Sequence, residues 1–549
     1  MRDGLLRALV AGALSAALPL AAAACTKSSS AGHAGARNPW TRPGELVIGS
    51  AGEEPDSLNE MFAHTDATDQ IANLIDEPIF RYDPNGEYLP AAVREVPTLA
   101  NGGISRDGKT IVLHFRPGMR WSDGAPYDAR DFVFTWRAAM NPRNNVKLRA
   151  GWDDIAAIGV SADHLTATVR LKHVYASILG TWAYGGAAYP PLPAHLLANL
   201  PDINHAAYNA RPISSGPFVL TRWNHGSSLE FAPNPYYWRG KPGLQRIVYK
   251  IVPDANTLFD QLETHEVDVY ESIPDAQVPR LRTLRGYAIT KRLTANYRRL
   301  AFNTSKPALS DVRVRLAVAE AVDWDRINRT IYHGYNLRAA SDILPTSWAA
   351  PVGIRPYPHD VANAKRLLDA AGWRTGAHGD RSRDGVPLTF SVSTTPSKPA
   401  NVQAELEMQQ DLAAAGIRLQ IKNYQTNLLF AMNGPIYTGR FDSEFTIDTN
   451  APDPDNEGLW SGAFIPPRGA NTTWLNDPVL TRTSHEALLT FDRAKRKALY
   501  QREAERIHQL VPVVYLYWQN SFSAVNSDLK NWKPASYISN YWNCWEWRI

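Results

Sequence analysis

The sequence contains several groups of residues whose types could perform chemistry, but none has the spacing that the chemistry needs. The stretch 453–458 (DPDNEG) resembles the start of a calcium-binding loop, yet its twelfth position is Phe464, where a bidentate Glu is required. His265 lacks the second His of a zinc-protease helix. Asp153 and Asp154 are adjacent, and adjacent residues of a strand point to opposite faces. These groups predict neither a metal site nor a catalytic site.

Other enzyme signatures are absent from the sequence. There is no G-x-x-x-x-G-K-[ST] loop for phosphates, no G-x-G-x-x-G turn opening a helix and no G-x-S-x-G nucleophile elbow. The 14 His residues show no ligand spacing, and Cys25 and Cys544 form neither a disulfide framework nor a zinc motif. We therefore expect no catalytic residue, no metal and no cofactor. An extracellular hydrolase stays open as another class, but it would need paired acids facing each other across a cleft.

The composition is that of a large globular protein. Of 549 residues, 44% are hydrophobic and 20% are charged, which is close to ordinary globular usage. This length provides core for about three or four domains. The 58 Lys and Arg residues exceed the 54 Asp and Glu residues by only four, so no nucleic-acid partner is expected. The 17 Trp and 23 Tyr residues suit both a packed core and a concave binding surface.

The N-terminus has the pattern of an export signal. Residues 1–24 combine early Arg residues with an Ala-rich apolar stretch that ends in small residues, and they are predicted to be a cleaved signal peptide. The run 22–25 (AAAC) resembles a bacterial lipoprotein cleavage site, although Ala stands where that site usually has Leu. Cys25 would then carry the lipid anchor, and residues 25–44 would form a flexible tether. The alternative is ordinary cleavage, and both predict a periplasmic or extracytoplasmic protein.

Hydrophobic periodicity predicts alternating strands and helices from residue 45 onward. Asp128 is expected to cap a helix whose apolar stripe includes Phe132, Val133 and Trp136. Strands are predicted at 46–50, 110–115, 388–393, 417–421 and 511–518. Helices are predicted at 65–76, 312–322, 361–371, 402–415 and 493–510. This alternation indicates an α/β fold with mixed sheets.

A long stretch of the sequence resembles a known family. Residues 105–136 (SRDGKTIVLHFRPGMRWSDGAPYDARDFVFTW) are similar to the signature of the extracellular solute-binding proteins of family 5, in which a strand leads to a Gly-containing turn and a helix. Six further blocks resemble this family in order along the chain, at 53–63, 74–90, 214–244, 302–327, 451–462 and 511–525. Their glycines and prolines suit turns and rigid bends, so most signature residues are expected to serve the fold.

The resemblance implies a fold and a division of the chain. The expected fold is an α/β two-lobed periplasmic-binding-protein clamp (type II-like, cluster C) with mixed sheets and an extra inserted domain. The expected parts are lobe I at 45–82, 206–298 and 513–549, the inserted domain at 83–205, and lobe II at 299–512. Crossings near 298–302 and 511–515 would act as hinges. A ligand would be enclosed as the lobes close.

The resemblance also implies a function, because members of this family are the peptide- and nickel-binding components of ABC importers. We expect a non-enzymatic monomer that captures di- or oligopeptides outside the cytoplasmic membrane and delivers them to an ABC permease. One alternative is the same fold binding a nickel chelate or another small solute. A second is a clamp that acts as a sensor or chaperone without transport.

The loop around residue 450 is the ligand site that the resemblance implies. Peptide-binding members pair the peptide ammonium with an Asp three residues before their Asp-Pro-Asp-Asn block, where this chain has Asn450. Either Asp448 replaces that Asp, or the protein binds no free N-terminus, since a neutral Asn lacks the strength of a charge-assisted hydrogen bond. The structural alternative is that Asp448 caps the loop. Asp453 and Asp455 are expected to order their own turn.

Further ligand contacts are predicted near this loop. A peptide carboxylate needs a cation, which Lys398 or Arg440 would supply. Tyr437 and Trp460 would line side-chain pockets. For each of these residues, a surface position or a place in the core is the competing interpretation.

Overall fold

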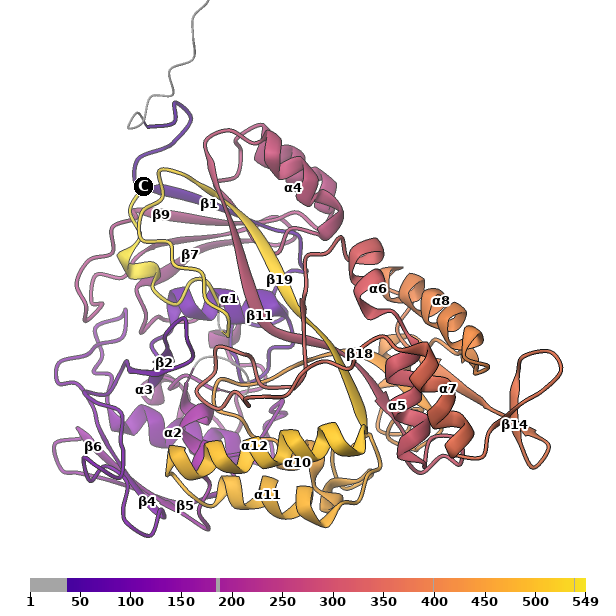
Figure 1. Cartoon of the computed structure of the whole chain (residues 1–549). Helices are drawn as coiled ribbons and strands as arrows, with labels where there is room; N and C mark the ends of the chain where they lie inside the picture. The colour runs from indigo at the N-terminus through magenta and orange to yellow at the C-terminus, as the bar shows by residue number, and fades with distance from the viewer. Residues whose placement is uncertain (1–36, 184–187, 398, 538) are drawn as a thin grey trace, which may run out of the picture.

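The computed structural model describes residues 37–183, 188–397, 399–537 and 539–549. Helices and strands alternate along these residues and form two lobes, which are joined by two long strands, β11 (Tyr287–Phe302) and β19 (Val513–Asn526) (Figure 1). No helix in the described ranges is both long and apolar enough to cross a lipid bilayer.

A single mixed sheet runs through both lobes. Its strand order is β17-β16-β18-β11-β19-β10-β1-β9-β8-β7, and β12 pairs with β19 outside this path. β16 is parallel to β17 and β18, and β1 is parallel to β9 and β10, whereas the other pairs are antiparallel. The remaining bounds, in the same order and ending with β12, are Arg418–Ile421, Thr389–Ser393, Ser443–Thr449, Val269–Tyr270, Glu45–Ser50, Arg246–Ile251, Ser228–Pro233, Phe218–Asn224 and Leu337–Arg338.

β11 and β19 connect the two groups of shorter strands. They pair with each other, while β11 also pairs with β18 and β19 also pairs with β10. Residues 513–518 are buried, as expected for a strand that is covered on both faces. The predicted strand 511–518 ends before the observed end at Asn526, because residues 519–521 are polar and half-buried and give no hydrophobic signal.

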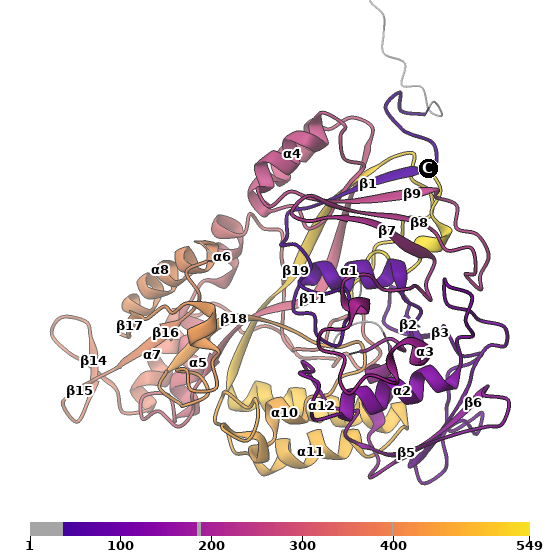
Figure 2. The ribbon, with the colours of Figure 1, turned by 180° about the vertical axis from the view of Figure 1, so that it is seen from behind.

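In the first lobe, neighbouring residues of β1 enter separate cores. Leu46 and Ile48 pack with α1 (Asp66–Ile75), whereas Val47 packs with α4 (Ala255–Glu263). This separation follows from the two-residue repeat of a strand. The view from behind shows α1 and α4 on opposite sides of β1 and its neighbours (Figure 2).

In the second lobe, helices pack on β16, β17 and β18 around one apolar cluster. Asp311, Asp323 and Asp360 begin three of these helices by accepting a hydrogen bond from a backbone N–H of the first turn. The bounds of α5, α6, α7, α8 and α9 are Val312–Ala321, Trp324–Ile331, Val361–Ala370, Pro399–Ala414 and Thr426–Leu429. A separate small sheet contains β13, β14 and β15, at Arg374–Thr375, Arg381–Arg383 and Val386–Pro387.

The segment 83–205 contains its own three-stranded sheet, with the order β4-β6-β5, and the helix α2. Asp128 caps α2 as predicted: its carboxylate accepts a hydrogen bond from Arg130 N at 3.0 Å, and Asp131 Oδ2 accepts one from Asp128 N at 3.1 Å. The bounds of β4, β5, β6, α2 and α3 are Thr110–His114, Ile155–Val160, Thr166–Leu171, Ala129–Met140 and Ala194–Leu197.

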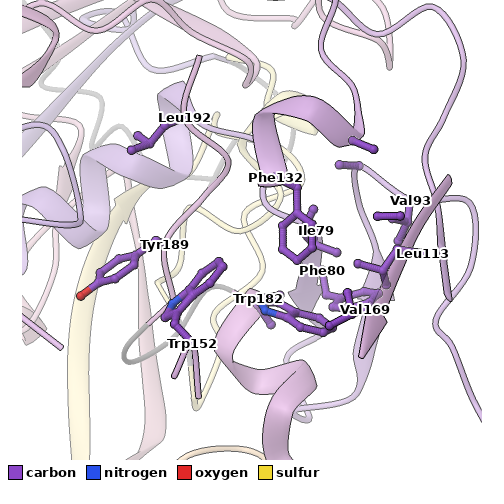
Figure 3. Close-up of a cluster of buried hydrophobic side chains, with 14 of the residues drawn as sticks. Ile79, Phe80, Val93, Leu113, Phe132, Trp152, Val169, Trp182, Tyr189 and Leu192 are labelled. Carbon is purple, nitrogen blue, oxygen red and sulfur yellow. The ribbon is translucent and has the colours of Figure 1, made fainter. Parts of the chain in front are cut away.

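Aromatic side chains fill the core beneath α2 (Figure 3). Phe132 meets Trp182 edge-on with 5.4 Å between ring centroids, and Trp152 stacks on Tyr189 at 6.0 Å. Much of the Trp and Tyr content is therefore core.

The same cluster extends outside 83–205, because it includes Met61 and Trp542. The hairpin of β2 (Phe80–Tyr82) and β3 (Tyr88–Pro90) also spans position 83. The predicted boundaries of the inserted domain stay a prediction.

Three helices of the second lobe lie against the segment 83–205 (Figures 1 and 2). Buried charge lies in this contact: Arg496 Nη1 pairs with Asp453 Oδ1 at 2.7 Å, and Arg496 Nη2 donates to Ser177 Oγ at 3.0 Å. The bounds of these helices, α10, α11 and α12, are Glu457–Trp460, Pro478–Leu488 and Arg493–Leu510.

Two tyrosine hydroxyls extend this contact. Tyr88 donates to Asp453 Oδ2 at 3.1 Å, and Tyr175 donates to Asp455 Oδ2 at 2.7 Å. These carboxylates therefore accept hydrogen bonds from a distant segment of the chain, in addition to any part they have in their own turn.

The buried carboxyl of Glu405 in α8 predicts a pH dependence of stability. Burial raises the pKa of Glu405 from 4.5 to about 7, although a hydrogen bond from Asn423 opposes this. Between these two values the folded protein holds a proton that the unfolded chain has released, so the free energy of unfolding falls as the pH rises. Glu405→Gln removes this proton exchange. We therefore expect the free energy of unfolding of the variant, minus that of wild type, to increase as the pH rises, by up to about 3 kcal/mol.

Urea unfolding of both proteins at about pH 5 and about pH 8 measures this gain. Glu486→Gln is the matched control, because Glu486 is exposed on α11, and it should show no such gain. Equal pH slopes for wild type and Glu405→Gln would contradict the prediction.

Candidate functional site

A cavity of about 430 Å³ lies between the lobes, beside the middle of β11 and β19. On the first-lobe side it is lined by α1 and by the segment that follows β10, and on the second-lobe side by Asn336 and Thr449. Residues 519–521 of β19 and the C-terminal segment after this strand also line it. The volume lies within the range of sites for small organic ligands.

The ladder between β11 and β19 is interrupted beside this cavity. The register shifts between Leu293 and Tyr297, and the intervening residues 294–296 line the cavity. A bulge removes residues from the ladder and turns their side chains, which is why bulges are common next to binding sites. The C-terminal segment supplies a replacement partner, since Ala295 N donates to Ser536 O at 2.9 Å.

The described lining carries an excess of negative charge. It includes one basic residue, Arg292, and most of its other members are Asn, Gln, Ser or Thr. Its acidic residues are Glu60, Asp66, Asp69, Glu271 and Asp275. The cavity therefore combines neutral hydrogen-bonding groups with carboxyls that outnumber the one lining cation.

Glu60 and Asp69 form a pair of carboxyls on the first-lobe side. Glu60 is buried, and its Oε2 accepts a hydrogen bond from Lys147 Nζ at 3.3 Å. Burial and the neighbouring Asp69 raise the pKa of Glu60 well above its usual value, although Lys147 opposes this. Burial also raises the pKa of Asp69, which shares a hydrogen bond with Glu60. Two neighbouring carboxyls resist holding two negative charges, so the pair favours a shared proton or a cation.

Glu271 and Arg292 occupy another part of the lining. Glu271 Oε2 accepts a hydrogen bond from Asn540 Nδ2 at 2.8 Å. Burial raises the pKa of Glu271 to about 7, and Arg292, Asn540 and Tyr541 oppose this shift. Arg292 also donates to the carbonyl oxygen of Ala535. The lining cation is thus engaged by groups of the protein itself.

Asp448 lines a different, smaller pocket together with Trp460, whereas its neighbour Thr449 lines the large cavity. Arg299 Nε lies 2.5 Å from Asp448 Oδ2, and Arg299 Nη2 lies 2.9 Å from Glu444 Oε1. Burial alone would lower the pKa of Arg299, but these two carboxylates raise it. The negative charge of Asp448 is therefore already paired. Its predicted contact with a ligand stays a prediction.

Asn450 and Trp460 share a partner. Asn450 Nδ2 donates to the carbonyl oxygen of Asp342 at 2.9 Å, and Trp460 Nε1 donates to Asp342 Oδ2 at 3.3 Å. Burial raises the pKa of Asp342 to about 6, and the hydrogen bond from Trp460 opposes this. The structure brings Asn450 and Trp460 together and holds both through protein hydrogen bonds. Their ligand contacts also stay predictions.

Tyr437 and Arg440 lie outside the lining of the large cavity. Tyr437 is half-buried in a small apolar cluster, and burial together with Glu444 raises its pKa. Arg440 is exposed, and its Nε donates to Thr438 Oγ1 at 2.9 Å. The predicted ligand contacts of Tyr437 and Arg440 stay predictions.

Lys398 and Cys25 lie outside the residues that the structure describes. Within those residues, no group of three or more His, Cys, Asp and Glu side chains could hold a metal ion.

The carboxyls of the large cavity are absent from the contacts predicted by sequence. Glu271 and Asp275 follow a strand of only two residues, and they reach the cavity because β10 pairs between β1 and β19. No spacing along the chain indicates this proximity. Arg292 lies in the long strand β11, a region where no strand was predicted, so it gave no local signal either.

Arg299 is predicted to be essential for stability. Glu444 is fully buried, so Arg299→Ala would leave a buried carboxylate without its cation, at a cost of about 3–5 kcal/mol. The Asp448 side chain is 31% exposed, so Asp448→Asn should cost less, about 2 kcal/mol or below. Urea unfolding measures both changes. Arg440→Ala is the control at an exposed Arg and should cost about 0.5 kcal/mol or less; an equal cost for Arg299→Ala would contradict the prediction.

Comparison with known proteins identifies the family. Residues 95–464 match the bacterial extracellular solute-binding proteins, family 5 Middle. The oligopeptide-binding protein AppA of Bacillus subtilis is 24% identical over 528 residues, which cover 94% of this chain and 94% of AppA.

Solved structures show the same fold. The structure of that AppA in complex with a nonapeptide has a TM-score of 0.74 at 22% identity, covering 92% of this chain and 99% of that chain. The structure of NikZ from Campylobacter jejuni in complex with Ni(L-His) has a TM-score of 0.76 at 23% identity, covering 93% of this chain and 100% of that chain. These likenesses confirm the predicted two-lobed fold. With the family match spanning most of the chain, the protein belongs to the bacterial extracellular solute-binding proteins of family 5.

Proposed function

We propose that this protein captures peptides in the large cavity between its lobes and delivers them to an ABC permease. The observation that carries the proposal is the cavity of about 430 Å³ beside the two strands that join the lobes. The similarity to an oligopeptide-binding protein over nearly the whole chain supports a peptide ligand. We propose binding without catalysis, by a monomer.

The polar lining suits the backbone of a peptide. Asn296, Asn336 and Gln519 line the cavity, and each side-chain amide can both donate and accept hydrogen bonds. An extended peptide needs donors and acceptors along its length, and strands with open positions supply them. Waters between ligand side chains and the wall would let one cavity accept varied sequences.

Closure of the lobes would follow from contacts that the ligand makes with both sides. A ligand shifts a conformational equilibrium only by its differential affinity for the two states. A peptide that touches α1 on one side and Thr449 on the other would make both contacts only when the lobes are close together.

The identity of the captured ligand tests the proposed function. We expect native mass spectrometry of the exported protein to show bound peptides of mixed sequence, because a clamp that binds backbone groups tolerates varied side chains. A peptide at about a hundredfold over its dissociation constant should then add about 2.7 kcal/mol of stability to the emptied protein. A bound metal chelate or sugar, with no stabilisation by any peptide, would contradict the proposal.

We also propose that the chain is exported and held at the outer side of the membrane through Cys25. The run 22–25 and the Ser-, Gly- and Ala-containing tether that follows it support this proposal. Cys25→Ser removes the thiol that would carry the lipid, so the variant should move from the membrane fraction to the soluble fraction. Detergent-free fractionation with quantitative blotting measures this change. Wild-type protein that is already soluble would contradict the anchor.

A further inference from the structure

We propose that the large cavity selects peptides that carry a positively charged side chain, Lys or Arg, over neutral and acidic peptides. This inference rests on the proposed function and deepens it, because it assigns a charge preference to the same cavity. It depends on the carboxyls of the described lining, which are distinct from the predicted contacts Asp448 and Asn450.

The first argument is charge balance. The described lining has five acidic side chains and one basic side chain. The basic group, Arg292, donates to the Ala535 carbonyl and lies near Glu271. Lys147, outside the lining, is bound to Glu60. The neighbouring cations of the protein therefore do not neutralise all of these carboxyls.

Two carboxyls of the lining, Asp66 at the start of α1 and Asp275 after β10, have neither an ion pair nor a side-chain hydrogen bond among the described residues. The charged groups that act on Asp275 are His333 and Arg298, and neither is within ion-pair distance of it. Both carboxyls reach the cavity, so a ligand cation would be their nearest opposite charge. A hydrogen bond between ionised partners is about twice as strong as a neutral one.

The second argument is an unfilled acceptor on the cavity wall. Glu60 is only 3% exposed, and apart from the proton that it can share with Asp69, its Oε1 receives no hydrogen bond from any donor in the described ranges. Its neighbour is the Asp69 carboxyl. A buried acceptor without a donor costs free energy, and a ligand ammonium or guanidinium with several N–H groups would supply that donor. This acceptor is independent of Asp66 and Asp275.

The neutral part of the lining remains available for the backbone of the same ligand. Asn296, Asn336 and Gln519 line the same cavity as Asp66 and Asp275. A peptide with one basic side chain can use both the amides and the carboxyls. An acidic side chain would face carboxyls of like charge, which disfavours the wrong partner.

Isothermal titration calorimetry with matched peptides tests this inference. The probes are Ala-Lys-Ala, the same peptide with N-ε-acetyl-lysine, and Ala-Glu-Ala, together with five-residue versions that carry Ala at both ends. Acetylation removes the charge and keeps the aliphatic chain, so it isolates the charge. We expect the Lys peptides to bind about tenfold or more tightly than their acetylated forms, and the Glu peptides to bind most weakly. The preference should shrink with added salt.

The variant Asp66→Asn/Asp275→Asn removes two negative charges without changing side-chain size. It should reduce the preference for Lys over acetyl-lysine to about threefold or less. Asp153→Asn is the matched control, because Asp153 is exposed in the segment 83–205, and it should keep the full preference.

The outcomes separate the two proposals. Peptides that bind wild type with no charge preference would overturn the charge selection and leave the proposed function standing, and an undiminished preference in the double variant would overturn the part that Asp66 and Asp275 play in it. If no peptide of any charge bound the emptied protein, the proposed function would fail, and the charge selection would fail with it.

Discussion

The antiparallel pairing of β11 with β19 is the constraint on which the other parts of this structure depend. One strand continues into the pairs of the second lobe and the other into the pairs of the first, so the sheet is continuous only through them. Paired strands resist stretching, and they bend where the ladder is weakest. The longer of the two interruptions in this ladder lies at residues 294–296. The cavity lies beside that interruption.

Buried charge has two distinct uses in the protein. On the second-lobe side, Arg299 holds Glu444 and Asp448 in a compact ion-pair cluster, so the charges are satisfied before any ligand arrives. On the first-lobe side, the carboxyls of the cavity outnumber their protein partners. The ion pairs of Arg299 hold neighbouring strands in place, whereas buried carboxyls without a partner at the cavity lower the stability of the protein. Such local violations of the rules for stable cores are typical of binding sites.

Local sequence signals predicted the elements well where caps and periodicity agreed. Helix α12 has the predicted bounds 493–510, because Asp492 accepts hydrogen bonds from two N–H groups of the first turn and Pro512 follows the last turn. The strand ending at Asn526 was predicted too short, since its polar residues face the cavity.

The family resemblance predicted the fold and directed attention to the loop near 450, where Asn450 and Trp460 do share a partner. The cavity carboxyls come from segments far apart in the chain, so only the sheet order brings them together.

The contact between the segment 83–205 and the second lobe has a consequence for the empty protein. Tyr88 and Tyr175 donate hydrogen bonds to the carboxylates of Asp453 and Asp455, which lie 365 and 280 residues further along the chain. Opening this contact would require water to replace one phenol donor at the buried Asp453 and another at the exposed Asp455. Two hydroxyl groups outside the cavity lining therefore help to hold the segment 83–205 in place in the absence of a ligand.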